Sequence, residues 1–173
     1  ILVSDEIYER LVYDGKRQTS IASLPGMADR TVTFNGLSKA YSMTGWRLGY
    51  AAAPKDLIIA MNKIHQHNTT CAPSFVQRAA ITALRDEGDE VELMVREFER
   101  RRDYAVEAIN KMEGASCVTP KGAFYIFINV KGLGRPCAEV AEYLLEEAKV
   151  ALVPGNVFGR NGEGYLRMSF ANS

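Results

Sequence analysis

The feature that most constrains the fold is a long stretch of helical periodicity in the middle of the chain. It begins at Asp89, a residue type that caps helix N-termini, and continues to Met112. Apolar residues at helical spacing mark one face: Val91, Met94, Val95, Phe98, Ala105, Ile109 and Met112. The pattern predicts a single amphipathic helix over residues 89–112, with regions of different secondary structure before and after it.

Three consecutive arginines at 100–102 lie within this stretch, and a basic run of this kind can indicate a nucleic-acid-binding patch. Acidic residues flank the run, at Glu97, Glu99 and Asp103. Glu97 precedes Arg101 by four residues, the spacing of a helical ion pair. The whole chain carries 21 basic and 21 acidic residues, a balance that does not favour a polyanionic partner. We therefore interpret the run as a solvated helix face and expect no nucleic-acid partner.

The region before the long helix has the mixed pattern of an α/β domain. Short apolar runs predict strands at residues 1–3, 31–34 and 46–53. Helical spacing predicts helices at residues 55–65 and 75–84. Glu87 and Gly88 interrupt the helical pattern, so we assign residues 1–88 to this domain. Because the chain opens inside an apolar run without an initiator methionine, we expect it to be a fragment of a longer protein.

Beyond Gly114 the pattern changes to that of a small α+β domain. Strand-like runs occur at residues 116–118, 124–130, 150–153 and 165–170. A helix is predicted at residues 138–149. We therefore assign residues 89–173 to a second part, which consists of the long connecting helix and this small C-terminal domain.

The cysteines and histidines do not indicate a metal or redox site. Cys71, Cys117 and Cys137 are far apart, odd in number and form no CxxC motif, which is typical of free thiols in a reducing compartment. His65 and His67 are two residues apart, so on a helix they point to different faces. No apolar run approaches the length of a membrane span. We expect a cytoplasmic protein with no metal ion and no membrane partner.

Asp5 lies where the first predicted strand meets its following loop. Open α/β sheets place their ligand sites at such carboxyl ends of strands. Tyr8 follows three residues later, close enough to share a site with Asp5. The alternative is that Asp5 only caps the next turn, as aspartates after strands often do.

The stretch GLSKAYSMTGWRLG, at residues 36–49, follows the second predicted strand and sets one lysine and one arginine among small residues. Small residues allow the backbone to approach a ligand closely. A partly desolvated lysine such as Lys39 can act as an amine nucleophile, although a surface lysine is the more common case. Arg47 offers a planar fork that binds phosphate through two hydrogen bonds, and an internal salt bridge is the alternative.

This stretch resembles, over its whole length, the pyridoxal-phosphate attachment signature of class I/II aminotransferases. SDEIY, at residues 4–8, resembles the aspartate-and-tyrosine motif of the same family. KGAFY (121–125), LVPG (152–155) and LRMSFANS (166–173) resemble its C-terminal domain. The resemblance implies an α/β fold that is the C-terminal part of a PLP-transferase: a partial large-domain sheet with helices, a long connecting helix and a small α+β domain.

The resemblance implies pyridoxal 5'-phosphate as the cofactor and gives roles to four residues of the first domain. Lys39 would hold the cofactor as a Schiff base and then move the proton during catalysis. Asp5 would pair with the pyridine nitrogen and keep it protonated, so that the ring withdraws electrons. Tyr8 would hydrogen-bond the phenolic oxygen of the ring, and Arg47 would bind the phosphate.

The same resemblance implies a substrate-binding residue and reveals one departure from the family. Arg167, near the end of the last predicted strand, would bind the α-carboxylate of the substrate, and a solvent-exposed strand-end charge is the alternative. Many members carry a serine three residues before the lysine to contact phosphate, and here that position is Gly36. Ser38 is a weaker candidate for the phosphate contact. The family's phosphate-binding glycine loop and its stacking aromatic ring would lie upstream of this chain.

The implied activity is transfer of an amino group between an L-amino acid and a 2-oxo acid, in a homodimer. The strings SDEIYERLVYDG and TGWRLGY are most similar to the bacterial aspartate aminotransferase branch, which favours an aspartate-type donor. Two alternatives stay open: a PLP-dependent carbon–sulfur lyase of the same fold, and the aminotransferase-like sensor domain of a transcription regulator. We expect the fragment alone to be inactive.

Overall fold

The computed structural model describes residues 1–85 and 89–172. The chain divides into two compact units, Ile1–Leu93 and Met94–Ser173. This division lies in the first turns of the long helix α3 (Asp89–Asn110), a few residues beyond the expected boundary between residues 88 and 89. The expected helix break at Glu87 and Gly88 lies outside the described residues.

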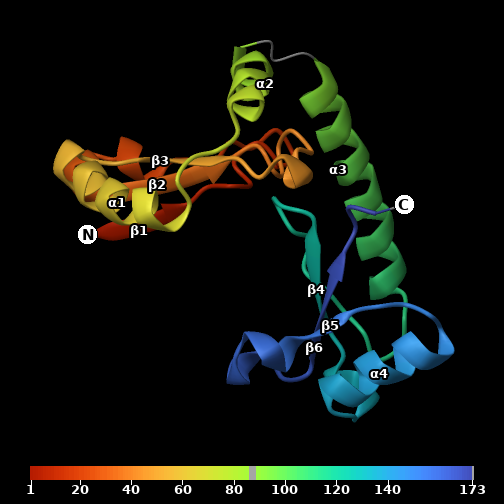
Figure 1. Cartoon of the computed structure of the whole chain (residues 1–173). Helices are drawn as coiled ribbons and strands as arrows, with labels where there is room; N and C mark the ends of the chain where they lie inside the picture. Colours follow the sequence, from red (N-terminus) through yellow and green to blue (C-terminus); the bar gives the residue numbers. More distant parts are fainter. Residues whose placement is uncertain (86–88, 173) are drawn as a thin grey trace. The chain divides into compact units, whose positions relative to one another are not determined.

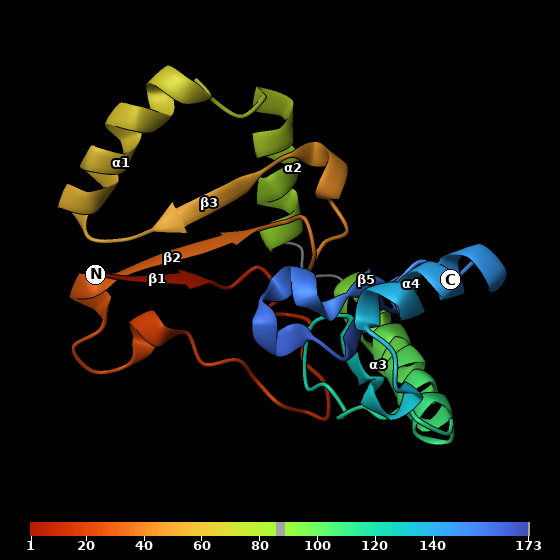
Figure 2. The ribbon, with the colours of Figure 1, turned by 90° about the horizontal axis from the view of Figure 1, so that it is seen from below.

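The first unit is built on a three-stranded sheet (Figures 1 and 2). β1 (Leu2–Asp5) pairs in parallel with the central strand β2 (Thr31–Gly36), which pairs antiparallel with β3 (Gly49–Ala52). Two helices follow, α1 (Lys55–Asn68) and α2 (Ser74–Arg85). The strands and helices expected from the apolar patterns are confirmed here, with one change of boundary.

That change concerns the strand expected at residues 46–53. Trp46 belongs instead to the 3-10 turn η3 (Thr44–Trp46), and β3 begins only at Gly49. The reason is local, because Arg47 adopts a left-handed conformation with φ 55° and ψ 47°. An extended strand cannot continue through such a residue.

The second unit contains an antiparallel sheet of order β4-β6-β5, in which β6 is the central strand (Figure 1). Its strands are β4 (Tyr125–Asn129), β5 (Val153–Pro154) and β6 (Tyr165–Ser169). Helix α4 (Cys137–Glu147) precedes β5, and the 3-10 turns η5 (Gly155–Phe158) and η6 (Arg160–Gly162) connect β5 to β6.

The two faces of this second sheet differ. Ile126, Ile128 and Leu166 are buried on one face, and α4 packs against β5 and β6. Phe98 of α3 adds ring contacts with Phe124 and Phe170, at centroid distances of 5.8 and 6.5 Å. The alternate residues of β4 and β6 point to the opposite face, because successive side chains of a strand alternate.

Three expectations for the second unit are wrong in detail. α3 ends at Asn110, and Met112 is 57% exposed rather than on the buried face. Residues 116–118 form only an isolated bridge, between Ser116 and Asn129. The strand expected at 150–153 is reduced to Val153 and Pro154, because Val150 N still bonds to Leu144 O at the end of α4 (3.0 Å).

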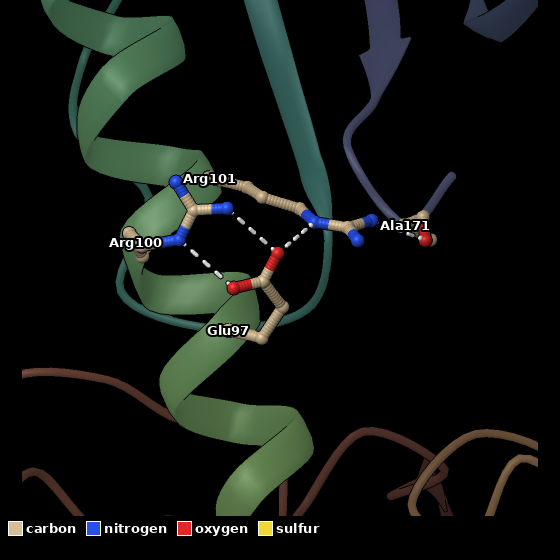
Figure 3. Close-up of polar contacts among 4 residues, drawn as sticks. All are labelled: Glu97, Arg100, Arg101 and Ala171. Atoms are coloured by element: carbon tan, nitrogen blue, oxygen red, sulfur yellow. Dashed lines mark hydrogen bonds and ion pairs between the residues drawn. The ribbon is translucent and has the colours of Figure 1, made fainter. Parts of the chain in front are cut away.

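The arginine run on α3 is only partly the solvated face that its flanking acids suggest. Figure 3 shows Glu97 accepting hydrogen bonds from Arg100 and from Arg101 Nε, the latter at 2.7 Å, which confirms the expected pair. Arg101 Nη1 also donates to Ala171 O at 3.0 Å and so joins α3 to the segment after β6. Arg102, in contrast, is buried at 2% exposure, so the interpretation as a solvated face is wrong for this residue.

Candidate functional site

The carboxyl ends of β1 and β2 lie next to each other, because the two strands are parallel neighbours. Asp5, the last residue of β1, is paired with Phe34 of β2, and Glu6 N extends the ladder to Phe34 O at 2.8 Å. β2 ends at Gly36, three residues before Lys39. The sheet therefore brings Asp5 and the start of the loop that carries Lys39 to one edge.

Asp5 caps the turn that follows β1, which is one of the two alternatives considered for it. Its Oδ1 accepts a hydrogen bond from Ile7 N at 3.2 Å, so it does cap the following turn. The side chain is nevertheless exposed, and no other described residue of its unit bonds to the carboxylate. Tyr8 is half-buried in the same turn, whose backbone is closed by the bond from Leu11 N to Tyr8 O at 2.9 Å.

Gly36 stands where the backbone is too crowded for a side chain. A Cβ built on it would lie 3.0 Å from Leu48 O and 3.1 Å from the Cα of Gly49, the residue paired with it in β3. These atoms belong to the main chain, so a serine here would require β2 and β3 to move apart slightly. This crowding is a physical reason for the departure from the family pattern at this position.

Lys39 lies in a compact turn between two buried residues. Leu37 and Ala40 are 1% and 3% exposed, and Lys39 itself is half-buried. The turn is held by the bonds from Tyr41 N to Leu37 O and from Ser42 N to Lys39 O, both 3.3 Å. The backbone of the lysine is thus anchored from both sides, which restricts the directions that its side chain can take.

Ser38 and Arg47 are connected through Thr44. The Thr44 hydroxyl donates to Ser38 O at 2.9 Å, and Arg47 Nη1 donates to Thr44 O at 2.8 Å. Within the described residues of its unit, Arg47 has no carboxylate partner, so the alternative of an internal salt bridge is not realised there. The exposed guanidinium keeps N–H groups for an anion. Thr44 was not predicted from the sequence, because its only indication is its place within the stretch at residues 36–49.

A shallow cleft of about 460 Å³ adjoins Arg47. Trp46 and Phe75 form an aromatic part of its wall, with ring centroids 6.5 Å apart. Water competes less for an anion that is bound to an arginine beside apolar rings than for one bound to an arginine surrounded by solvent. The cleft therefore suits a ligand with an anionic end and a flat apolar body.

Arg167 is the third residue of β6 and lies opposite Phe127 of β4 and Val153 of β5. It is half-buried rather than a strand-end charge in solvent, because its Cζ lies 4.6 Å from the ring centroid of Tyr125 and 4.7 Å from that of Phe158. No described residue of its unit accepts a hydrogen bond from the guanidinium. Sequence reasoning missed Phe158, since nothing in its local pattern indicates a cation–π contact.

The predicted site residues thus form two groups, one in each unit. Asp5, Tyr8, Ser38, Lys39 and Arg47 belong to the strand ends and the following loop of the first unit. Arg167 belongs to the exposed face of the second sheet. In the part of the chain that the structure describes, no three His, Cys, Asp or Glu side chains gather as a metal site would require, and no helix is long and apolar enough to cross a membrane.

Comparison with known proteins gives consistent results. The family model "Aminotransferase class I and II" matches residues 1–173. The aromatic-amino-acid aminotransferase 2 of Thermococcus litoralis and the aspartate aminotransferase of Pyrococcus abyssi are each 50% identical over 175 residues. Each alignment covers 100% of this chain and 45% of the relative, so the chain spans about half the length of the curated relatives it matches.

Solved structures extend the agreement to the fold. The aromatic aminotransferase from Pyrococcus horikoshii is 48% identical with a TM-score of 0.96, over 100% of this chain and 47% of that structure. The aspartate aminotransferase from Rhizobium meliloti is 40% identical with a TM-score of 0.94, over 99% and 45%. The predicted fold class is confirmed, and the chain belongs to the family of class I and II aminotransferases.

Proposed function

We propose that this chain is the C-terminal part of an aminotransferase that moves an amino group between an L-amino acid and a 2-oxo acid. The observation that carries the proposal is the meeting, at one sheet edge, of Asp5 with the loop that presents Lys39 and Arg47. Family membership over residues 1–173 supports it. The activity is that of a protein of the relatives' length, of which this chain spans about 45%.

The donor groups of the first unit fit pyridoxal 5'-phosphate. Arg47, exposed and without a carboxylate partner in its unit, would bind the phosphate, and Ser38 lies in the same hydrogen-bonded turn. The open carboxylate of Asp5 would bind the pyridine nitrogen, and Tyr8 the phenolic oxygen. Lys39 would form the covalent link. When bound, the cofactor supplies an electron sink for the pair left at Cα when a proton is removed.

The side chains of this protein would carry out the proton transfers. The amine Nζ of Lys39, once released from its covalent link, would accept the proton from the substrate Cα and return it one position away. The backbone anchors of Lys39 would keep this general base in place. Arg167 would hold the α-carboxylate through its free N–H groups and so align the Cα–H bond.

We also propose an aspartate-type donor, a homodimeric assembly and a cytoplasmic setting. The donor preference rests on sequence similarity to aspartate aminotransferases, although an aromatic aminotransferase is equally similar. The cytoplasmic setting is supported by three free cysteines, of which Cys71 is exposed. A reducing compartment is the usual environment for exposed free thiols.

The test is an amino-transfer assay on a protein of the relatives' length, with aspartate, alanine and phenylalanine as donors and 2-oxoglutarate as acceptor. We expect glutamate to form, and aspartate to give the highest kcat/KM. Release of pyruvate and sulfide from a cysteine-type substrate without glutamate formation would instead support the lyase alternative. Ligand binding without turnover of any donor would support the sensor alternative.

A further inference from the structure

The guanidinium of Arg167 is contacted by two aromatic rings that reach it from different strands. Tyr125 belongs to β4, on one side of β6, and its ring centroid lies 4.6 Å from the arginine Cζ. Phe158 ends the turn η5 that follows β5, on the other side of β6, and its ring centroid lies 4.7 Å from the same atom. Because β6 is the central strand, one ring comes from its neighbour β4 and the other from the turn that follows its neighbour β5.

This arrangement leaves the hydrogen-bonding edge of Arg167 open. The N–H donors of a guanidinium all lie in its plane, and in a cation–π contact the guanidinium lies over the face of the aromatic ring. Rings provide no carbonyl or carboxylate oxygen to satisfy these donors. Within the described residues of the second unit, Arg167 has no hydrogen-bond acceptor and no ion-pair partner. A half-buried cation in this state is prepared for an anion from outside the unit.

The ring of Phe158 is itself held in place. Phe127 meets it edge-on at a centroid distance of 6.2 Å, and Phe127 is stacked on Tyr165 at 5.0 Å with an interplanar angle of 9°. The loop after Phe158 is fixed by the Glu163 carboxylate, which accepts bonds from Cys137 N at 2.9 Å and from Gly164 N at 3.1 Å. The ring therefore belongs to a supported surface and not to a free loop.

We propose that Tyr125 and Phe158 are positioning residues that orient the guanidinium of Arg167, so that only its in-plane donors are available to a planar carboxylate. This inference rests on the proposed function, which assigns the substrate α-carboxylate to Arg167. The rings restrict the rotamers of a flexible side chain before the substrate arrives. They also exclude water from the faces of the guanidinium, so that hydrogen bonds at its edge are strengthened.

The expected energetic effect is moderate, and it acts on binding. Without one ring, the side chain of Arg167 can rotate in the free protein and must be fixed when the carboxylate binds. The Kd of the carboxylate should therefore rise by about five- to tenfold, which corresponds to the size of one cation–π contact. The effect should be equal for every donor, since all share the α-carboxylate. It should appear in KM and in Kd, while kcat changes by less than about twofold.

The experiment measures the Kd of 2-methylaspartate and 2-methylphenylalanine, which lack a Cα–H and so bind without reacting. Phe158→Leu and Tyr125→Leu should each raise both values by about five- to tenfold. Phe158→Tyr and Tyr125→Phe keep the ring and should restore wild-type affinity. Tyr143→Leu is the control, because it removes an exposed ring of α4 that contacts neither Arg167 nor Phe158 among the described residues, and it should leave both values unchanged.

Nuclear magnetic resonance of arginine-labelled wild-type protein gives a second measurement that needs no turnover and no ring variant. The Nε–H resonance of Arg167, assigned by its loss in Arg167→Lys, should be shifted upfield by ring currents in the absence of substrate. A resonance at the position of a solvent-exposed arginine would overturn the inference, even if the leucine variants fail to fold.

The outcomes separate this inference from the proposed function. If Arg167→Lys lowers carboxylate affinity but both leucine variants match the wild type, the positioning role is wrong and the carboxylate site stands. If Arg167→Lys leaves the affinity of both probes unchanged, the role of Arg167 in the proposed function fails as well. A change with Tyr143→Leu as large as with Phe158→Leu would reduce the effect to general packing and overturn the positioning role.

Discussion

Two arginines of the second unit, Arg102 on α3 and Arg167 on β6, differ in how the surrounding chain treats their charge. Arg102 is 2% exposed and donates to Asp103 Oδ1 at 2.8 Å and to Pro120 O at 3.2 Å. Arg167 is half-buried, contacts two aromatic rings and has no acceptor among the described residues of its unit. The charge of Arg102 is neutralised by acceptors inside the unit, whereas the N–H groups of Arg167 stay available to a ligand.

This difference distinguishes a charge that the fold satisfies internally from one that it leaves without an acceptor in its unit. Leaving a buried cation without an acceptor costs free energy, so a fold that needs the arginine only for stability supplies oxygen atoms to it. A fold that supplies only rings retains the unsatisfied donors for a ligand. The same distinction applies to Arg47 in the first unit, which has no carboxylate partner among the described residues there, compared with Lys111, which follows α3 and is paired with Glu107.

The largest expected effect follows from removing the lysine that we propose forms the covalent link to the cofactor. Lys39→Ala should abolish amino transfer, because it removes the amine proposed to form the covalent link and to move the proton. Borohydride reduction of the cofactor-loaded protein, followed by peptide mapping, should locate the label on Lys39. The matched change Lys111→Ala removes a paired lysine and should leave turnover within about twofold. A label on any other lysine would show that the assignment is wrong.

A second effect compares the two arginines through kinetics. Arg167→Lys should lower kcat/KM for aspartate, alanine and phenylalanine alike by about a hundredfold, because lysine cannot reproduce the two-pronged bond to a carboxylate. Cofactor binding should stay nearly intact. Steady-state kinetics with each donor provide the measurement, and Arg102→Lys is the control, expected to leave kcat/KM close to wild type in the folded protein. A loss confined to aspartate would mean that Arg167 binds the side chain of the donor.

For the free energy of unfolding the expected order is reversed, and the substitution of Arg102 should have the larger effect. Arg102→Ala should lower the free energy of unfolding by about 2–4 kcal/mol, since it removes several buried hydrogen bonds and leaves a cavity. Arg167→Ala should cost less, about 1–2 kcal/mol, because it loses only two ring contacts at a partly exposed position. Urea denaturation of both variants measures the difference. Equal losses would remove the basis for distinguishing the two arginines.

The smallest effect concerns pH and the exposed ion pairs of α3. Hydrogen bonds from Arg100 and then from Arg101 lower the pKa of Glu97 from 4.5 to about 2. A folded-state pKa below the unfolded value means that the stabilisation is complete above about pH 4.5 and is lost as the pH falls through about 2. The denaturation midpoints of wild type and Glu97→Gln should therefore differ slightly at neutral pH and converge near pH 2. Midpoints that differ equally at all pH values would rule out this linkage.

The position of the first group at neighbouring strand ends could be predicted because its signal is local. Lys39, Ser38 and Arg47 lie within fourteen consecutive residues, and Asp5 ends a recognisable strand. The error in the strand at 46–53 has the same local origin. Arg47 adopts a positive φ of 55° although it is neither glycine nor asparagine, so its residue type does not indicate that the strand begins later.

The burial of Arg102 and the contacts of Arg167 could not be predicted in the same way. Helical spacing assigns Arg102 to a position on α3, but its acceptor Pro120 O comes from a loop eighteen residues further on. Phe158 reaches Arg167 only because β5 pairs with β6 and the turn η5 follows directly. Such tertiary pairings depend on register between strands, which an apolar pattern leaves undetermined.

The loop that supports Phe158 restricts how relatives of this protein can diverge. Gly155 and Gly162 approach so closely that a Cβ on either one would collide with the backbone of the other. Neither position can accept a larger residue alone, and a compensating change at the partner is not available because both are already glycine. Evolutionary adjustment of this surface to new substrates is therefore confined to the residues between and around the two glycines, and these two positions should be the slowest to drift.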